Sequence, residues 1–171
     1  RRTLDFIESN PLNEKDQIFK DIINQLYDNS AAGIILQNNT GINQIRYDLK
    51  VEIDGADSDG IDNARILAFD ILNLFYGSNH NINFLWHDNR LFADINPKAR
   101  ASWFKFILSE LKSTNKQYIA SLNNENLISM KEYLSPKEYS EIESCIILNL
   151  KGDRPENKLL GIQIENYIEE N

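Results

Sequence analysis

Polar side chains follow two strand-like runs of this sequence, at the points where the runs end. Residues 82–86 are followed directly by His87 and Asp88, and residues 117–122 are followed by Asn123. A carboxylate at a strand end can orient a water molecule or hold a hydrated divalent cation. Taken from the residues alone, His87 and Asp88 could form a metal pair, an acid–base pair or the start of a capped loop.

A loop of turn-forming residues at 54–60 precedes a mostly apolar segment at 61–76. A helix N-terminus preceded by Ser58 and Gly60 would offer oriented backbone N–H groups to a phosphate. Together with the two polar strand ends, this loop indicates phosphate chemistry. The sequence contains no G-x-x-x-x-G-K-[ST] phosphate loop, so we expect that the chain cannot hold a nucleotide unaided.

The spacing of apolar residues predicts the elements that position these side chains. A three-four spacing predicts helices over 13–28 and 61–76, and alternation around a turn at 38–41 predicts a hairpin over 32–53. Asn96 before Pro97 predicts the start of another helix, which runs to about residue 111. We also expect strands at 82–86, 117–122 and 145–150, a short helix after Ser135 and an edge strand within 158–164.

The order of these elements predicts an α/β fold, with a β-hairpin followed by a mainly parallel sheet covered by helices. In the hairpin, Tyr47, Leu49, Val51 and Ile53 are expected on one face. Open α/β sheets place ligands at the carboxyl ends of their strands. The polar residues at 87, 88 and 123 fall at such ends. The length of 171 residues fits one domain.

Composition excludes several classes of protein. The net charge of −8 gives no electrostatic footprint for nucleic acid, because phosphate backbones are bound by clustered Lys and Arg. No apolar run approaches the length of about 18 residues that a membrane span requires. We therefore expect a cytoplasmic protein without membrane contact, and one that binds DNA only as part of a larger assembly.

Five further residues are expected to serve the fold. Cys145 lies in an apolar run and is expected in the core, as are Trp86 and Trp103. Arg65 lies on the apolar segment 61–76, where a charge needs a partner, so a structural ion pair is favoured over phosphate contact. His80 is expected in a solvated loop.

The ordered series of motifs over residues 57–124 resembles the C-terminal lobe of SMC, RecN and other ABC-type ATPase heads. In such heads a coiled-coil arm leads to a hairpin, a signature loop with its helix, a Walker B strand, a D-loop and a switch strand. The chain looks closest to a bacterial group of SMC-like proteins catalogued as a domain of unknown function. Members of that group carry a similar His-Asp strand end and a similar Gln-Tyr-Ile strand.

The resemblance implies that three residues act between two heads. Ser58 and Gly60, in the signature loop, would contact the γ-phosphate of a nucleotide held by the opposite head. Asp94, in the D-loop, would couple the two nucleotide sites. These residues would therefore matter only in a dimer of heads.

The resemblance also implies a role for the two polar strand ends. His87 and Asp88 would end the Walker B strand, where His87 would help to order the magnesium shell and Asp88 would position water. Both would be metal-site residues, and Asn123 would stand in place of the switch histidine. The implied cofactors are ATP and magnesium, bound only in the full-length assembly.

The function implied is that of the C-terminal lobe of an SMC/RecN-like ATPase in DNA repair or phage defence. Residues 1–30 would be a helix at the base of a coiled-coil arm, and 31–171 the ATPase-head lobe. Because the chain starts in a helical pattern without Met, we expect that something upstream was cut away, and the resemblance implies that it is an N-terminal ATPase lobe. That lobe and a second head would be the partners, and the isolated chain would be inactive.

Two other interpretations remain open. A degenerate head could bind a partner protein without hydrolysing ATP. Alternatively, Asp88 and Asp94 could belong to a metal-dependent nuclease of Toprim type, although such a site usually needs a further acidic residue at an earlier strand end.

Overall fold

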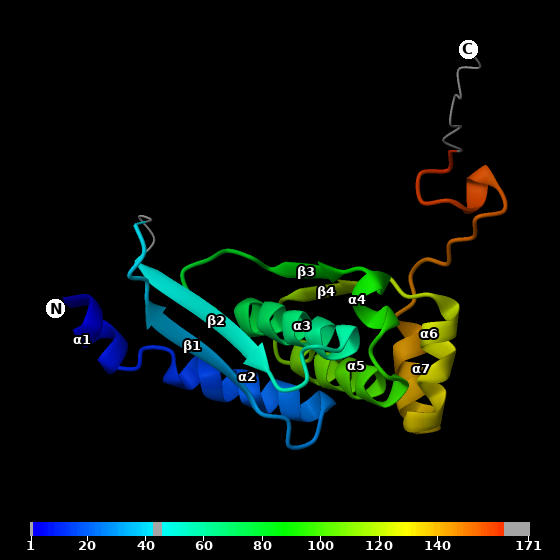
Figure 1. The fold of residues 1–171 in the computed structure, drawn as a ribbon. Helices are drawn as coiled ribbons and strands as arrows, with labels where there is room; N and C mark the ends of the chain where they lie inside the picture. The colour runs from blue at the N-terminus through cyan, green and yellow to red at the C-terminus, as the bar shows by residue number, and fades with distance from the viewer. Residues whose placement is uncertain (1, 43–45, 163–171) are drawn as a thin grey trace, which may run out of the picture. The chain divides into compact units, whose positions relative to one another are not determined.

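The computed structural model describes residues 2–42 and 46–162 (Figure 1). The chain divides into two compact units, 1–135 and 136–171. Among the described residues, the first unit contains three long helices and two pairs of strands. Short helices are α1 (Arg2–Glu8), α4 (Asn89–Ala93), α6 (Asn124–Ser129) and a 3-10 turn at Lys131–Tyr133.

Three long helices form the core of the first unit. They are α2 (Asn13–Leu26), α3 (Asp59–Tyr76) and α5 (Pro97–Leu111), and α2 contacts both of the others. The three-four spacing that predicts them is confirmed, because the apolar stripes are buried. The side chains buried at this junction are Phe19, Ile22, Ile23, Leu67, Ala68, Ile71, Trp103 and Ile107.

The start of α5 is set by its capping residue. The side-chain oxygen of Asn96 accepts a hydrogen bond from the N–H of Ala99 at 2.9 Å, and Pro97 takes the first helical position. This satisfies one of the N–H groups that a helix start leaves without a partner. The predicted Asn-Pro start is confirmed.

The predicted hairpin is formed by β1 (Ala32–Asn38) and β2 (Tyr47–Ile53), which pair in antiparallel register. Ile34 and Ile53 are buried on its inner face, where β1 contacts α2 and β2 contacts α3. The alternation of residues 47–53 is confirmed, although Leu49 is half exposed. The connection is longer than a turn at 38–41, and residues 43–45 lie outside the described residues.

A second, parallel pair consists of β3 (Phe84–His87) and β4 (Gln117–Ala120). Within the described residues it is the whole of the parallel sheet, so the expectation of a mainly parallel sheet holds only in part. Side chains alternate across it, and β3 contacts α3 while β4 contacts α5. No described helix of the first unit covers its outer face. Trp86 is 61% exposed, so the prediction that it is a core residue is wrong, whereas Trp103 is fully buried as expected.

The first unit also includes the segment predicted as the base of an arm. Residues 1–30 lie in the same compact unit as the hairpin and α5, and the chain turns between α1 and α2 at Asn10, whose φ is 48°. A coiled-coil arm upstream of α2 stays a prediction.

The second unit contains α7 (Pro136–Ser144) and a 3-10 turn at Pro155–Asn157. The helix predicted after Ser135 is confirmed. The strand predicted at 145–150 is absent, since no described residue pairs with this apolar segment and a strand needs a neighbour for its N–H and C=O groups. Cys145 is exposed, so its predicted place in the core is wrong. No strand forms at 158–162, and 163–164 lie outside the described residues.

Candidate functional site

Asp88 is an exposed carboxylate at the carboxyl end of β3. Its Oδ1 accepts a hydrogen bond from the N–H of Arg90 at 3.0 Å, which caps α4, and its Oδ2 accepts one from the hydroxyl of Ser121 at 3.1 Å. The backbone N–H of Arg90 and then the Ser121 hydroxyl lower the pKa of Asp88, because both stabilise the ionised form. The carboxylate is therefore held charged and oriented at neutral pH.

A small polar network joins the loops after β3 and β4. The Ser121 hydroxyl accepts a hydrogen bond from the N–H of Asn89 at 3.2 Å. The side-chain oxygen of Asn89 accepts the N–H of Asn123 at 2.7 Å and the side-chain N–H of Asn126 at 3.0 Å. The loops that carry Asp88 and Asn123 are thus brought together, as expected for neighbouring parallel strands. The residues that join them could not be recognised from the sequence, because a Ser or Asn after a strand is equally common in ordinary loops.

His87 is buried inside the first unit with only 2% of its surface exposed. Its Nδ1 lies 2.8 Å from the Tyr118 hydroxyl and its Nε2 lies 3.1 Å from Oδ2 of Asp70. Trp103 donates its indole N–H to the same hydroxyl at 3.1 Å. With the Asp70 carboxylate ionised, a consistent assignment has Nε2 donating to Asp70 and Nδ1 accepting the hydroxyl proton of Tyr118.

These partners bear on the predicted magnesium role of His87. Both ring nitrogens of His87 are already hydrogen-bonded, so coordination of a metal ion by this ring would break one of these two hydrogen bonds. No group of three His, Cys, Asp or Glu residues that could hold a metal ion occurs in the described part of the chain. The role of His87 in a magnesium shell stays a prediction.

The loop at Ser58 and Gly60 lies against Asp94. Gly60 is buried, and a Cβ added to it would collide with the backbone carbonyl of Asp94. Ser58 caps α3 through its backbone carbonyl, which accepts the N–H groups of Ile61 and Asp62, and makes no side-chain cap. The structure therefore brings three of the predicted interface residues together, and Gly60 serves close packing here.

Arg100 is a buried cation that was not predicted from the sequence. It is 2% exposed and donates to the carbonyl oxygens of Phe92, Ile95 and Asn126 and to the hydroxyl of Ser129, at 2.6–3.2 Å. Burial lowers the pKa of its guanidinium, which nevertheless stays charged at neutral pH. Arg100 ties the segment after α4 to α6. Arg100 lies three residues before Trp103 on the buried face of α5, and this spacing was the sequence feature that could have indicated its burial.

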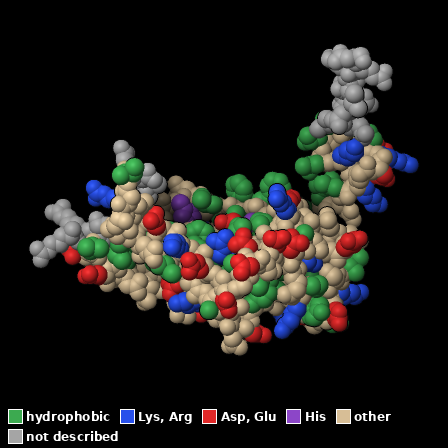
Figure 2. Space-filling view, in the orientation of Figure 1, with side chains coloured by type: hydrophobic (Ala, Val, Ile, Leu, Met, Phe, Trp, Pro, Cys, Tyr) green, Lys and Arg blue, Asp and Glu red, His purple; other side chains and the backbone are tan. Residues whose placement is uncertain are grey.

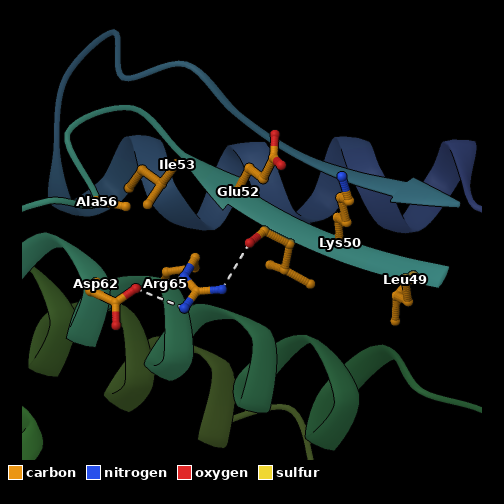
Figure 3. Close-up of a pocket in the computed structure, with 8 residues that line it drawn as sticks. Leu49, Lys50, Glu52, Ile53, Ala56, Asp62 and Arg65 are labelled. Atoms are coloured by element: carbon orange, nitrogen blue, oxygen red, sulfur yellow. Dashed lines mark hydrogen bonds and ion pairs between the residues drawn. The ribbon is translucent and has the colours of Figure 1, made fainter. Parts of the chain in front are cut away.

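A groove of about 570 Å³ lies between β2 and α3 (Figure 3). Arg65 reaches across it and donates to the carbonyl of Val51 at 2.9 Å, and it forms an ion pair with Asp62 at 2.7 Å. The predicted structural ion pair is confirmed. None of the predicted site residues lines this groove.

His80 caps the C-terminal end of α3. Its Nε2 lies 2.9 Å from the carbonyl of Asn73, and its Nδ1 accepts the N–H of Ile82 at 3.1 Å. It lies in a loop, as predicted, and it has this local capping role.

Comparisons with known proteins give one family. The model of a family described as "Uncharacterised protein conserved in bacteria (DUF2326)" matches residues 22–164. No curated protein matches. Among solved structures, the Smc head domain of Pyrococcus furiosus, bound to the C-terminal domain of ScpA, is 16% identical with a TM-score of 0.48. The alignment covers 76% of this chain and 37% of that one, so this chain spans well under half of its length. No described helix is long and apolar enough to cross a membrane.

Proposed function

The chain belongs to the bacterial family DUF2326, and from that premise we propose that it is the C-terminal lobe of an SMC/RecN-like ATPase head. The lobe would act on ATP only when joined to an N-terminal phosphate-loop lobe and a second head. One observation carries the proposal: an exposed, ionised Asp88 is held at the end of β3 by Arg90 and Ser121, beside the end of β4.

In this proposal Asp88 orients the attacking water, since a carboxylate with one oxygen fixed by each loop keeps its direction. Asn89 and Ser121 hold the two loops together, and Asn123 lies on the second loop. His87 holds the inner face of β3 in place through its hydrogen bonds with Tyr118 and Asp70. The described residues contain no group of three His, Cys, Asp or Glu residues that could hold a metal ion, so we assign no step to magnesium. ATP and magnesium would be bound chiefly by the N-terminal lobe.

The second head would meet the loop at Ser58 and the exposed Asp94. Gly60 would set the spacing between them, because it is packed against the carbonyl of Asp94. Contact with DNA and a role in DNA repair or phage defence would belong to the whole assembly. These parts of the proposal are supported by the resemblance alone.

ATP turnover by the natural full-length polypeptide tests the proposal. Asp88→Asn should abolish turnover and leave ATP binding intact, because it removes the charge but little volume. Asp48→Asn is the matched control, since Asp48 is an exposed carboxylate on the hairpin. Equal, clearly measurable rates for wild type and Asp88→Asn would remove Asp88 from catalysis. The 171-residue chain alone should not bind ATP, and micromolar binding in calorimetry would contradict the split site.

A degenerate head that binds a partner protein without hydrolysis is the second candidate. It is favoured by His87, whose ring is occupied by Asp70 and Tyr118 at the position where the resemblance expects a magnesium ligand. Absence of turnover in the wild-type full-length polypeptide, with ATP binding retained, would select this candidate.

A further inference from the structure

The outer face of the β3–β4 pair is an apolar surface that no described residue of the first unit covers. Phe84 and Trp86 are each 61% exposed and Ile119, the register partner of Trp86, is 39% exposed. Ile82, directly before β3, is also exposed. We call these four residues the outer patch. Figure 2 shows hydrophobic side chains gathered along the rim above β3.

The other sheet of the molecule does not expose such a surface. On the solvent face of the hairpin, Gln37, Asp48, Lys50 and Glu52 are polar, and Ile35 is the single large apolar side chain. An exposed β-hairpin is commonly protected in this way. The contrast indicates that the apolar character of the outer patch has a specific use.

The inner face of the same strands is rigidly held. His87 on β3 and Tyr118 on β4 are joined at 2.8 Å, and they are fixed in turn by Asp70 of α3 and Trp103 of α5. Because side chains alternate along a strand, fixing the inner residues also fixes the direction of the outer ones. The outer patch is therefore a preformed surface.

We propose that the outer patch is the docking surface for one amphipathic helix, which lays an apolar stripe across β3 and β4. Parallel sheets are normally covered by helices on both faces, and among the described residues of the first unit helices contact only the face toward α3 and α5. The helix would be carried by the N-terminal lobe, so this inference rests on the proposed function and specifies how the two lobes join.

The size of the outer patch favours a helix over a second copy of this chain. Its four side chains expose roughly 400 Å² together, if each large apolar side chain has about 200 Å² of surface. A stable dimer buries about 800 Å² on each partner. One helix stripe matches the smaller area.

Quenching of tryptophan fluorescence by iodide tests whether the outer patch is covered. Trp103 is fully buried, so the quenched signal of the 171-residue chain should come from Trp86, and Trp86→Phe should remove it. In the natural full-length polypeptide the quenching should fall several-fold. Quenching that is equally strong in the full-length polypeptide would overturn the proposal.

A photo-crosslinking benzoylphenylalanine in place of Phe84 identifies the occupant. Crosslinks to one upstream segment at positions about three or four residues apart are expected for a helix. Crosslinks about two residues apart would indicate a strand, and crosslinks to a second copy of residues 1–171 would indicate a dimer. Either result would overturn the proposal.

Variants separate this inference from the proposed function. Phe84→Asp in the full-length polypeptide should restore iodide access to Trp86, whereas Ile35→Asp, an exposed apolar strand residue of the hairpin, should not. Restored access is a readout of docking that requires no turnover. Helical crosslinks together with an Asp88→Asn variant that turns over ATP as fast as wild type would retain the docking surface and refute the catalytic role. Loss of turnover in Asp88→Asn without helical crosslinks would refute the docking surface alone.

Discussion

Gly60, at the start of α3, lies against the backbone carbonyl of Asp94, and the contact leaves no room for a side chain at residue 60. The neighbouring atom is backbone, so it cannot turn aside as a flexible side chain could. The contact fixes the start of α3 against the end of α4. It explains why the smallest residue stands at this position, independently of any contact with phosphate.

Gly60→Ala should destabilise the protein by about 1–3 kcal/mol, because an added methyl group must displace backbone. Urea unfolding of wild type and variant measures the change. Gly152→Ala is the matched control, since no atom lies within 4 Å of a Cβ added there, and it should be nearly neutral. Equal stability of Gly60→Ala and wild type would show that the segment at Asp94 moves freely.

Arg100→Met should lower the free energy of unfolding by about 3 kcal/mol, because buried carbonyl oxygens lose their donors. Arg100→Lys should also destabilise, since one ammonium group cannot reach oxygens on both Phe92 and Asn126 as the guanidinium does. Arg154→Met, a change at an exposed arginine, is the control. A fully stable Arg100→Lys would show that charge alone suffices.

The long helices and the hairpin could be predicted from the sequence because their patterns are local. Residues three or four apart on α2 and α3 report directly which face is buried, and Asn96 caps its helix through neighbouring atoms. The burial of Arg100 could not be read in the same way. It depends on carbonyl groups of two other segments, which only the tertiary fold brings together.

Trp86 and the segment 145–150 show the opposite limit. Their residue types indicate burial or pairing, yet Trp86 is exposed and no described residue pairs with 145–150 in a strand. Hydrophobicity predicts that a surface will be covered, but it does not say by which polypeptide. For the candidate site, strand ends could predict the meeting of Asp88 with the Asn123 loop, whereas the inward direction of His87 depended on the phase of the pleat.

Asp16 and Arg65 protect opposite edges of the hairpin. Asp16 accepts the N–H of Ile34 at 2.7 Å and Arg65 donates to the carbonyl of Val51, and Ile34 and Val51 are register partners. In a non-hydrogen-bonded pair of an antiparallel ladder, the backbone N–H and C=O groups point away from the partner strand. Without Asp16 and Arg65, these groups of Ile34 and Val51 would be open to another chain.

Asp16→Ala should speed amide exchange at Ile34, with Asp21→Ala on the same helix as the control. Burial opposes ionisation of Asp16, but hydrogen bonds from Lys20 and Ile34 outweigh it, so its pKa is lowered. The protection should therefore be complete above the unfolded pKa of about 4 and be lost as pH falls through the lower folded value. Exchange at Ile34 that is unchanged in the variant would contradict the capping role.

Tyr118→Phe should lower the free energy of unfolding by about 1–3 kcal/mol, because the hydroxyl serves both His87 and Trp103. Tyr133→Phe, a change at an exposed tyrosine, should have little effect. Urea unfolding at neutral pH measures both. Equal stability of the two variants would show that the buried hydroxyl is replaceable.

Tyr118→Phe should also change how the stability of the protein responds to alkaline pH. Burial raises the pKa of Tyr118, so the folded protein keeps the phenol proton at a pH where the unfolded chain has lost it. The stability that this supplies is complete below the unfolded pKa of about 10 and is lost as pH rises toward the folded value, by up to about 1.4 kcal/mol per pH unit. Tyr76, whose pKa burial and Glu110 raise to about 12, adds a similar loss. Tyr118→Phe should therefore lose stability less steeply above about pH 10 than wild type or Tyr133→Phe. Parallel curves of unfolding free energy against pH for the three proteins would mean that Tyr118 ionises as freely in the folded protein as in the unfolded chain.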